Sequence, residues 1–308
     1  MTDALSGKKI LVTGPTGQVA EPITRALARD NDVWGVARFS DPAARERLDA
    51  LGVHCVALDL ATGEFDALPD DFDYVLNLAV VRGGDGDWDR DLAANAEATG
   101  LLMAHCRRAT AFLQCSSTAV YQHQGPEHPL RETDPLGDNH RVMMPTYSIA
   151  KISAEVVARL GARQWNLPTT IARLNVPYGD NGGWPAWHLE FMLHGMPIQL
   201  HPEQPNRFNP IHEDDIIRQI PRLLEIASVP ATIVNWAGPV SSIEEWCTYL
   251  GELTGLEPEF VVTDATIGSV TTDNTRMHEL VGEARVGWRD GIRRMVEARH
   301  PELLGARR

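Results

Sequence analysis

Tyr147 and Lys151 are the two residues of this sequence whose types and spacing most clearly suggest chemistry. They stand four positions apart at the start of a helix predicted over 146–164, and this spacing places two side chains on one helix face. A free tyrosine has a pKa of about 10 and is a poor base at neutral pH, but a nearby ammonium favours its ionised form. The pair could therefore act as a general acid and base. The alternative is an exposed lysine beside a packing tyrosine, and only structural context can decide.

Lysine is rare in this chain, which makes position 151 informative. Of the 28 lysines and arginines, only Lys8, Lys9 and Lys151 are lysines. An ammonium is a compact charge that can approach both a phenol and a ribose hydroxyl, whereas a guanidinium is a wide planar fork. Ser116 and Ser117 follow an apolar strand predicted over 111–115 and add hydroxyl groups ahead of the Tyr147 helix.

A glycine-containing turn lies near the N-terminus, between a predicted strand over 8–12 and a helical pattern that begins at Val19. Gly14 permits a tight turn, Gly17 lets the backbone approach a diphosphate, and Ala20 is small enough for close packing of helix and strand. The N-terminal end of the helix would then attract the anion. The dinucleotide-binding candidates at this turn are Gly14, Thr16, Gly17, Gln18 and Val19. A plain strand-helix turn is the alternative.

The next strand, predicted over 32–37, bears on the choice of cofactor. Sites that prefer NAD usually carry an acidic residue about 20 positions beyond the glycines. Here Ala37 and Arg38 occupy this place, and Arg38 with Ser40 could receive a 2′-phosphate. The sequence therefore favours NADP, with NAD as the alternative, in which Arg38 would stack on the adenine. Further cofactor contacts are expected at the ends of the third and fourth strands, from Asp59, Leu60, Leu78 and Ala79.

Strands and helices alternate regularly through the first two thirds of the chain. Further strands are predicted over 53–58, 74–79, 169–174 and 232–236, and helices over 43–51, 87–108 and 213–227. Such alternation predicts an α/β fold, a Rossmann-type doubly wound parallel sheet with ligands at the carboxyl ends of its strands. We expect a dinucleotide-binding domain over 1–178, completed by about 209–238, and a smaller C-terminal substrate-binding lobe from 179–208 and 239–308. The segment 177–208 is rich in Pro, Gly, Trp and His and is expected to cover the substrate rather than to form sheet.

Composition limits the partners. With 28 basic and 42 acidic residues the net charge is −14, which argues against nucleic acid or an anionic membrane as partner. The chain shows no apolar signal core and no run of about 18 apolar residues, so we expect a cytoplasmic protein. The four cysteines have no CxxC spacing and are interpreted as buried apolar residues. The histidines show no HxxxH or HExxH spacing, so no metal site is expected.

These motifs together resemble the extended short-chain dehydrogenase/reductase superfamily, in the branch called the NAD-dependent epimerase/dehydratase family. The resemblance covers nearly the whole chain. It rests on the glycine turn, Asp59-Leu60, the segment 77–79, Asn95, the segment 116–121, the Tyr147/Lys151 pair, and the segments 173–179 and 210–215. Their order and spacing match collectively.

The resemblance implies roles for matching positions. Ser117 would hydrogen-bond the substrate oxygen, Tyr147 would be the general acid and base, and Lys151 would bind the nicotinamide ribose and favour the tyrosinate. Asn95 would support the active-site region from behind. Candidate substrate contacts are Thr118, Asn175, Trp184, Trp187 and Arg207. Members of the family pair through the helices that here would end near 108 and begin near 146, so we expect a homodimer.

Three functions remain open. The leading hypothesis is an NAD(P)-dependent oxidoreductase that interconverts a secondary alcohol and a ketone on a small molecule. The alternative is a sugar-nucleotide epimerase, and a cofactor-sensing regulator without catalysis is a third possibility. Thr118 and Ala119 stand where family dehydratases carry an Asp-Glu pair, which argues against dehydration. Arg207 is offset by about one position from the arginine that commonly holds the substrate diphosphate in the epimerases.

Overall fold

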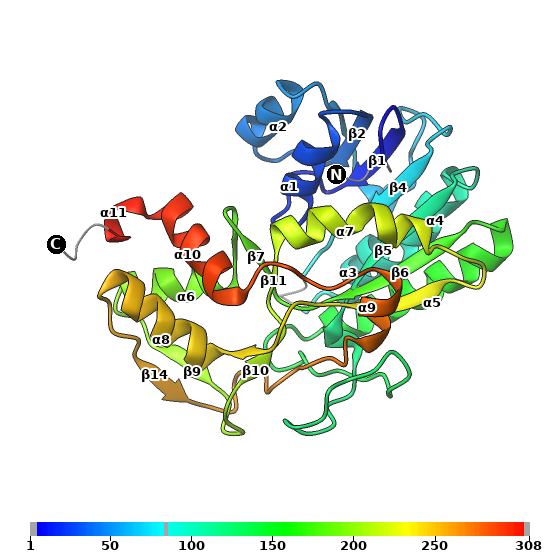
Figure 1. Ribbon diagram of the computed structural model, residues 1–308. Helices are drawn as coiled ribbons and strands as arrows, with labels where there is room; N and C mark the ends of the chain where they lie inside the picture. The colour runs from blue at the N-terminus through cyan, green and yellow to red at the C-terminus, as the bar shows by residue number, and fades with distance from the viewer. Residues whose placement is uncertain (1–4, 83–85, 305–308) are drawn as a thin grey trace.

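A seven-stranded sheet forms the centre of the protein in the computed structural model, which describes residues 5–82 and 86–304 (Figure 1). Its strands lie in the order β12-β6-β5-β4-β1-β2-β3, and every neighbouring pair is parallel. The strands are β1 (Lys9–Thr13), β2 (Asp32–Ala37), β3 (His54–Ala57), β4 (Tyr74–Asn77), β5 (Ala111–Ser117), β6 (Thr169–Leu174) and β12 (Thr232–Trp236). The predicted Rossmann-type doubly wound fold is confirmed.

Helices cover both faces of this sheet because successive strand residues point to opposite sides. Ile10 and Val12 of β1 belong to one apolar cluster, whereas Leu11 between them belongs to another. The first cluster packs under α1 (Ala20–Leu27), α2 (Pro42–Asp49), α7 (Glu213–Glu225) and α9 (Thr275–Leu280). The second packs under α4 (Ala98–His105) and α5 (Tyr147–Trp165).

The long helix predicted over 87–108 is instead three consecutive pieces. They are α3 (Trp88–Leu92), a π-helical turn η2 (Ala93–Glu97) and α4. Within them the Asn95 amide donates to the Asp91 carbonyl at 2.8 Å, and the Thr99 hydroxyl donates to the Asn95 carbonyl at 2.8 Å. Local π-helical turns recur at functional sites, where they redirect a side chain. Here the redirected residue is Asn95, which the sequence had assigned a supporting role.

A second, smaller lobe lies below and to the left of the sheet in Figure 1. Its helices are α6 (Trp184–Leu193), α8 (Ile243–Thr254), α10 (Trp288–Arg299) and α11 (Pro301–Leu304). Its strands are β7 (Pro177–Gly179), β8 (Gly182–Gly183), β9 (Ile198–Leu200), β10 (Arg207–Phe208), β11 (Ile211–His212), β13 (Ser241–Ser242) and β14 (Phe260–Val262). Two 3₁₀ turns, η1 (Leu60–Thr62) and η3 (Thr118–Val120), complete the elements.

The small strands correct the expectation that 177–208 forms no sheet. β7 pairs with β11 and β8, β9 with β14, and β10 with β13. Each strand has only two or three residues, and β9 and β10 pair with segments far away in the sequence. Alternation cannot be read over so few residues. The lobe has its own apolar cluster around Trp246, which fits the proposed division of the chain into two parts.

None of the helices in the described part of the chain has the length and apolar character needed to cross a membrane.

Candidate active site

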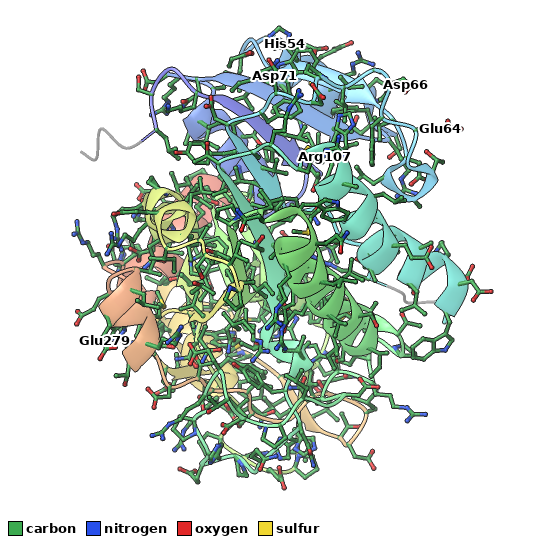
Figure 2. All side chains as sticks on the ribbon, turned by 90° about the vertical axis from the view of Figure 1, so that its right-hand side faces the viewer. His54, Glu64, Asp66, Asp71, Arg107 and Glu279 are labelled. Carbon is green, nitrogen blue, oxygen red and sulfur yellow. The ribbon has the colours of Figure 1, made fainter. Side chains whose placement is uncertain are left out.

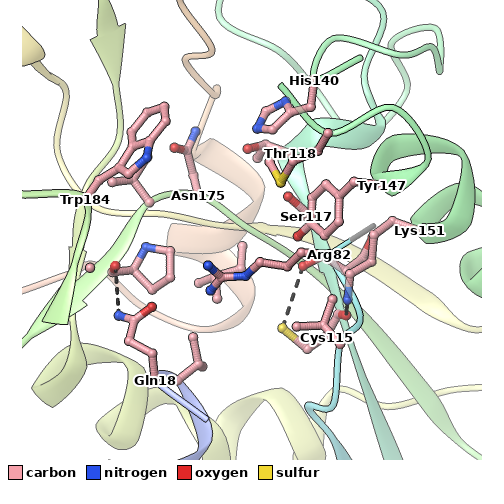
Figure 3. Close-up of a pocket in the computed structure, with 18 of the residues that line it drawn as sticks. Gln18, Arg82, Cys115, Ser117, Thr118, His140, Tyr147, Lys151, Asn175 and Trp184 are labelled. Carbon is pink, nitrogen blue, oxygen red and sulfur yellow. Dashed lines mark hydrogen bonds between the residues drawn. The ribbon is translucent and has the colours of Figure 1, made fainter. Parts of the chain in front are cut away.

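A cavity of about 450 Å³ lies between the carboxyl edge of the sheet and the smaller lobe (Figure 3). The sheet side contributes Gln18, Val19, Leu78, Val80, Arg82, Cys115, Ser116, Ser117, Thr118, Leu174, Asn175, Val176 and Pro177. The segment before α5 and α5 itself contribute His140, Met143, Met144, Tyr147 and Lys151, and the lobe side contributes Gly183, Trp184, Trp187, Phe208 and Val270. The predicted catalytic residues therefore all lie in one cavity.

The Tyr147/Lys151 pair occupies the first turns of α5, where both side chains line the cavity. Lys151 is only 4% exposed, and its ammonium donates to the carbonyl of Cys115 at 2.9 Å. A buried ammonium must be hydrogen-bonded, and this carbonyl fixes its position at the end of β5. The bond uses one of three N–H groups, which leaves the others for a ligand. This arrangement contradicts the alternative that Lys151 is an ordinary exposed helix lysine.

The two serines at the end of β5 have different surroundings. The Ser117 hydroxyl oxygen accepts a hydrogen bond from the Ala119 amide at 3.1 Å and faces the cavity, so its own proton is free to donate. Ser116 instead donates to the buried carboxylate of Glu155 at 2.6 Å. Ser117 is therefore the serine that can bind a substrate oxygen.

The α3–η2 segment is hydrogen-bonded to two parts of the active site, the loop after β4 and the residue before α5. The Asn95 side chain accepts from the Val81 amide and donates to the Val81 carbonyl, both at 3.0 Å. The buried carboxylate of Asp91 accepts from the Thr146 hydroxyl at 2.6 Å, one residue before Tyr147. The segment thus fixes the loop after β4 and the start of α5 together. Asp91 was missed in the sequence because a lone aspartate in a helix carries no signal.

The glycine turn has the geometry that a diphosphate requires. Gly14 has a φ of +62°, and a Cβ there would lie 3.0 Å from the Ala79 Cα, so a side chain is disfavoured both by the backbone conformation and by the close contact. The Thr13 hydroxyl accepts from the amides of Leu78 and Ala79 at 3.0 and 2.9 Å, which draws β1 and β4 together. α1 starts without a side-chain cap, the Glu21 amide donates to the Gly17 carbonyl at 2.8 Å, and Pro22 has no N–H, so an anion would be met by the turn before the helix and by its first residue rather than by the whole first turn. These residues fit a bound dinucleotide.

The remaining cofactor candidates lie at the edge beyond β2 and β3. The register pairs Ala37 with Ala57, so the segments that follow the two strands start side by side. Arg38 and Ser40 are exposed, and Leu60 is half-buried. The Asp59 carboxylate accepts from the Ala61 amide at 3.0 Å and caps η1. Thr16, next to the glycines, is half-buried.

Four of the five predicted substrate contacts line the cavity. Thr118, Trp184 and Trp187 offer side chains to it. Asn175 also lines it, but its side chain is already hydrogen-bonded within the protein. The side-chain nitrogen donates to the Val270 carbonyl at 2.8 Å, and the side-chain oxygen accepts from the Asn209 backbone amide at 3.4 Å. Its hydrogen-bonding groups thus join the two lobes.

Arg207 does not line the cavity, which differs from the prediction. Its guanidinium forms an ion pair with the Glu127 carboxylate at 2.7 Å on the surface. The side chain therefore turns away from the position that the sequence spacing suggested.

The tryptophan-rich helix α6 begins at a glycine that no other residue could replace. Gly183 has a φ of +112°, and a Cβ there would lie 2.5 Å from the Pro177 carbonyl oxygen. Trp184 follows it and packs edge-on against Phe208, with ring centroids 5.0 Å apart. His188, one turn later, is buried and accepts from the Trp246 indole at 2.8 Å. Trp184 therefore forms a fixed wall of the cavity, while His188 belongs to the core of the lobe.

The lining residues that sequence reasoning missed include Arg82, His140, Met143 and Met144. Arg82 follows β4 by five positions, and its guanidinium lies 5.6 Å from the centre of the Trp187 ring. The other three precede α5 in a stretch without periodicity. The signal that could have found Arg82 is its place just after a strand end, where the ligand edge was already predicted.

The lining is free of negative charge in the part of the chain that the structure describes. Arg82 and Lys151 are its cations, and none of its residues is Asp or Glu. Such a cavity in a chain of net charge −14 favours an anionic ligand. Over residues 5–82 and 86–304, no group of three or more His, Cys, Asp or Glu side chains could hold a metal ion.

Several solved structures resemble this fold. UDP-glucuronic acid 4-epimerase from Bacillus cereus, in complex with UDP-glucuronic acid and NAD, has a TM-score of 0.80 at 20% identity, covering 94% of this chain and 98% of that chain. dTDP-glucose 4,6-dehydratase DesIV from Streptomyces venezuelae, with NAD bound, has a TM-score of 0.81 at 20% identity, covering 94% and 96%. MoeE5 in complex with UDP-glucuronic acid and NAD has a TM-score of 0.79 at 25% identity, covering 94% and 98%.

A comparison with curated proteins gave no match. Residues 10–244 match the NAD dependent epimerase/dehydratase family, which is more than half of the chain. Together with the parallel sheet, the glycine turn and the Ser117, Tyr147 and Lys151 cavity, this match shows that the chain belongs to the NAD-dependent epimerase/dehydratase family.

Proposed function

We propose that the protein is an NAD-dependent epimerase of nucleotide sugars, which inverts one secondary alcohol of the sugar through a transient ketone. The observation that carries the proposal is the shared cavity of Ser117, Tyr147 and Lys151, whose described lining holds two cations and no carboxylate. The sequence had put a broader alcohol–ketone oxidoreductase first. The epimerases among the similar structures support the narrower alternative better.

The proposed cofactor is NAD rather than the NADP that Arg38 and Ser40 suggested. The family description and the NAD in the similar structures support it. Gly14, Gly17 and the start of α1 would hold the diphosphate, and exposed Arg38 would stack on the adenine. Bound NAD would supply the hydride chemistry of the reaction, as acceptor for the alcohol and as donor to the ketone.

The chain's own residues orient the alcohol and move its proton. The Ser117 hydroxyl donates to the substrate oxygen and holds it beside the phenol. Tyr147 takes the hydroxyl proton as the alcohol is oxidised and returns it when the ketone is reduced. Lys151, anchored by the Cys115 carbonyl, places its charge beside the developing phenolate and offers its remaining N–H groups to the ribose.

The cavity's composition favours epimerisation over elimination. Removing water from a sugar requires an acid and a base in addition to the tyrosine, and family dehydratases carry an Asp-Glu pair for that step. Thr118 and Ala119 occupy these positions, and no described lining residue is a carboxylate. The guanidinium of Arg82 suits the diphosphate of the substrate.

An assay with UDP-glucose and UDP-glucuronic acid tests the proposal. Each sugar nucleotide is incubated with NAD, while reduced nicotinamide is followed by absorbance and the sugars by chromatography. We expect a C4 epimer to form without accumulation of NADH. Stoichiometric NADH would instead support the broader oxidoreductase. Dinucleotide binding without turnover of these sugars or of simple alcohols would support the regulator, although retention of the Tyr147/Lys151 pair argues against it.

We also propose that the protein is a homodimer that pairs through α4 and α5. These helices pack together, and they expose Leu101, Val156 and Leu160, with exposed fractions of 42%, 58% and 64%. Figure 2 looks onto this side of the molecule, where Arg107 marks the residues just beyond α4. Apolar side chains grouped on a helical face are typical of a protein interface.

Leu160→Glu tests this interface. Because the change would bury a carboxylate between two copies, we expect the dimer to dissociate to a 34.0 kDa monomer in sedimentation-velocity experiments. Val262→Glu is the matched control, since Val262 is similarly exposed, at 55%, but lies in β14 of the other lobe. A Leu160→Glu protein of unchanged mass would contradict the proposed interface.

A further inference from the structure

His140 is a cavity residue to which neither the family resemblance nor the proposed reaction gives a role. It lies seven residues before Tyr147, and the two ring centroids are 6.0 Å apart with an angle of 39° between the planes. Figure 3 shows it beside Thr118, on the opposite side of the cavity from Gln18. The ring is thus at the substrate end of the cavity, away from the glycine turn.

Neighbouring residues fix the tautomer of His140. The Asn139 side-chain amide donates to the Thr118 carbonyl at 3.1 Å, and a carbonyl can only accept. The Asn139 side-chain oxygen must therefore be the atom that faces His140 Nδ1, with which it forms a short hydrogen bond. Because that oxygen accepts, Nδ1 carries the proton. The second nitrogen, Nε2, is then bare when the ring is neutral.

The ring is neutral at physiological pH because burial lowers the pKa of His140 to about 4. Nε2 has no hydrogen-bond partner in the described part of the chain. An atom without a partner can be either sealed in the protein or accessible. The fully buried side-chain atoms without a partner there are Asp138 Oδ1, His212 Nε2 and Glu213 Oε2, so His140 Nε2, which also has no partner, is accessible. It is therefore open to the cavity rather than sealed in protein. A neutral, unpaired imidazole nitrogen is a hydrogen-bond acceptor.

We propose that His140 Nε2 accepts a hydrogen bond from a second hydroxyl of the substrate, one that does not react. The proposal rests on the proposed function and narrows its substrate class to sugars that keep a free hydroxyl beside the reacting carbon. Among the described cavity residues, the hydroxyl and ammonium groups of Ser117, Tyr147 and Lys151 serve the reacting oxygen and the cofactor. His140 adds an acceptor that no donor in the described part of the chain satisfies, so a donor on the ligand would take this place when the ligand displaces water. A ketone, ether or deoxy position there would leave it unpaired, which is costly in a buried site.

Asn139 is the positioning residue of this acceptor. Its amide couples the imidazole to the carbonyl of Thr118, the residue directly after Ser117. A short stretch of backbone therefore connects the Ser117 hydroxyl, which would hold the reacting oxygen, with His140 Nε2, which would hold the second hydroxyl. Their separation is thus fixed by the fold, which gives the cavity a means of measuring the spacing of two oxygens on one sugar ring.

Calorimetric titration of the NAD-loaded protein with UDP-glucose and with UDP tests the inference. UDP-glucose carries the sugar hydroxyls and UDP does not, so the ratio of the two dissociation constants isolates the sugar. We expect His140→Ala to weaken UDP-glucose binding about tenfold, leave UDP binding unchanged, and raise KM more than it lowers kcat. His140→Gln, whose side-chain oxygen can accept, should recover part of the loss. His278→Ala, at an exposed position on α9, is the control and should change neither ligand.

Nitrogen NMR of histidine-labelled protein provides an independent readout of the tautomer. We expect His140 to show a protonated Nδ1 and a bare Nε2 near neutral pH, and the Nε2 signal to shift when UDP-glucose is added. In Asn139→Ala, which lacks the acceptor for the Nδ1 proton, we expect a mixture of the two His140 tautomers. The inference is overturned if His140→Ala leaves the ratio of the UDP-glucose and UDP dissociation constants unchanged, or if Nε2 is protonated in the wild type. Neither result would contradict the proposed epimerase activity. If wild-type protein binds neither ligand, the proposed function fails first and the inference falls with it.

Discussion

Replacing Tyr147 by phenylalanine should lower kcat by about 10²- to 10⁴-fold, because this change removes the group that takes and returns the substrate proton. The phenol oxygen is the only atom lost, and the ring still packs at the start of α5 beside His140. Cofactor binding should change little, since Lys151 keeps its bond to the Cys115 carbonyl. The measurement is single-turnover conversion of UDP-glucose, combined with an NAD titration followed by quenching of tryptophan fluorescence.

Tyr249→Phe is the matched control for this variant. Tyr249 lies in α8, where its ring packs edge-on against Trp288 with centroids 5.7 Å apart, and it does not line the cavity. It should keep wild-type turnover. If Tyr147→Phe and Tyr249→Phe turn over at the same rate, Tyr147 is not the acid and base, and the proposed mechanism fails.

Replacing Glu155 by glutamine should lower the free energy of unfolding by about 3–5 kcal/mol, because it leaves the buried guanidinium of Arg173 without a counter-charge. Arg173 donates to Glu155 through Nε at 2.9 Å and through Nη2 at 2.8 Å, and both side chains are only 2% exposed. The Arg173 guanidinium also lies 4.7 Å from the centre of the Tyr121 ring. The same carboxylate receives the Ser116 hydroxyl, so the pair connects β5, β6 and α5 beneath the cavity.

Urea denaturation followed by circular dichroism measures this loss. Glu225→Gln is the control, because the Arg222–Glu225 pair has a similar distance of 2.6 Å but side chains that are 46% and 66% exposed. An exposed pair contributes at most about 1 kcal/mol. Equal effects of the two substitutions would show that burial does not govern the Glu155 pair. Exchanging both partners, as in Glu155→Leu with Arg173→Met, should recover part of the loss, since no charge is then left unpaired.

The central sheet could be predicted from the sequence because its signal is local. β2, β6 and β12 have the bounds that the apolar runs indicated, and the glycine turn lies between β1 and α1 as expected. The inner strands β1, β4, β5 and β6 are buried on both faces and are flanked by turn residues, which gives short apolar runs that stand out in the sequence. The position of the Tyr147/Lys151 pair followed from the same alternation, since ligands lie at the strand ends.

The smaller lobe and the far side of the cavity could not be predicted in this way. Its strands are too short for a period, and most pair with strands far away in the sequence, so their partners are unknown until the chain has folded. Arg207 matched a family position only approximately, and the structure pairs it with Glu127, a residue 80 positions away. His140 and Arg82 lie in irregular segments, where only tertiary packing shows which side chains reach the cavity.

The π-helical turn illustrates the same limit within a helix. The segment 87–108 was predicted to be one continuous helix, and nothing in its sequence indicates the extra residue in the turn. In this turn buried Asn95 accepts from the Val81 amide and donates to the Val81 carbonyl, contacts that lie outside the helix. Its position therefore depends on the loop after β4, which the helical period does not report.

Isotope tracing tests the central claim most directly. UDP-glucose carrying deuterium at C4 is incubated with NAD and wild-type protein, and the recovered sugar nucleotides are analysed by mass spectrometry and NMR. A hydride that leaves the sugar and returns within one cavity predicts a C4 epimer that retains the deuterium, with no NADH released. Loss of the deuterium to NADH with accumulation of a ketone, or an unchanged substrate in the presence of bound NAD, would contradict the account.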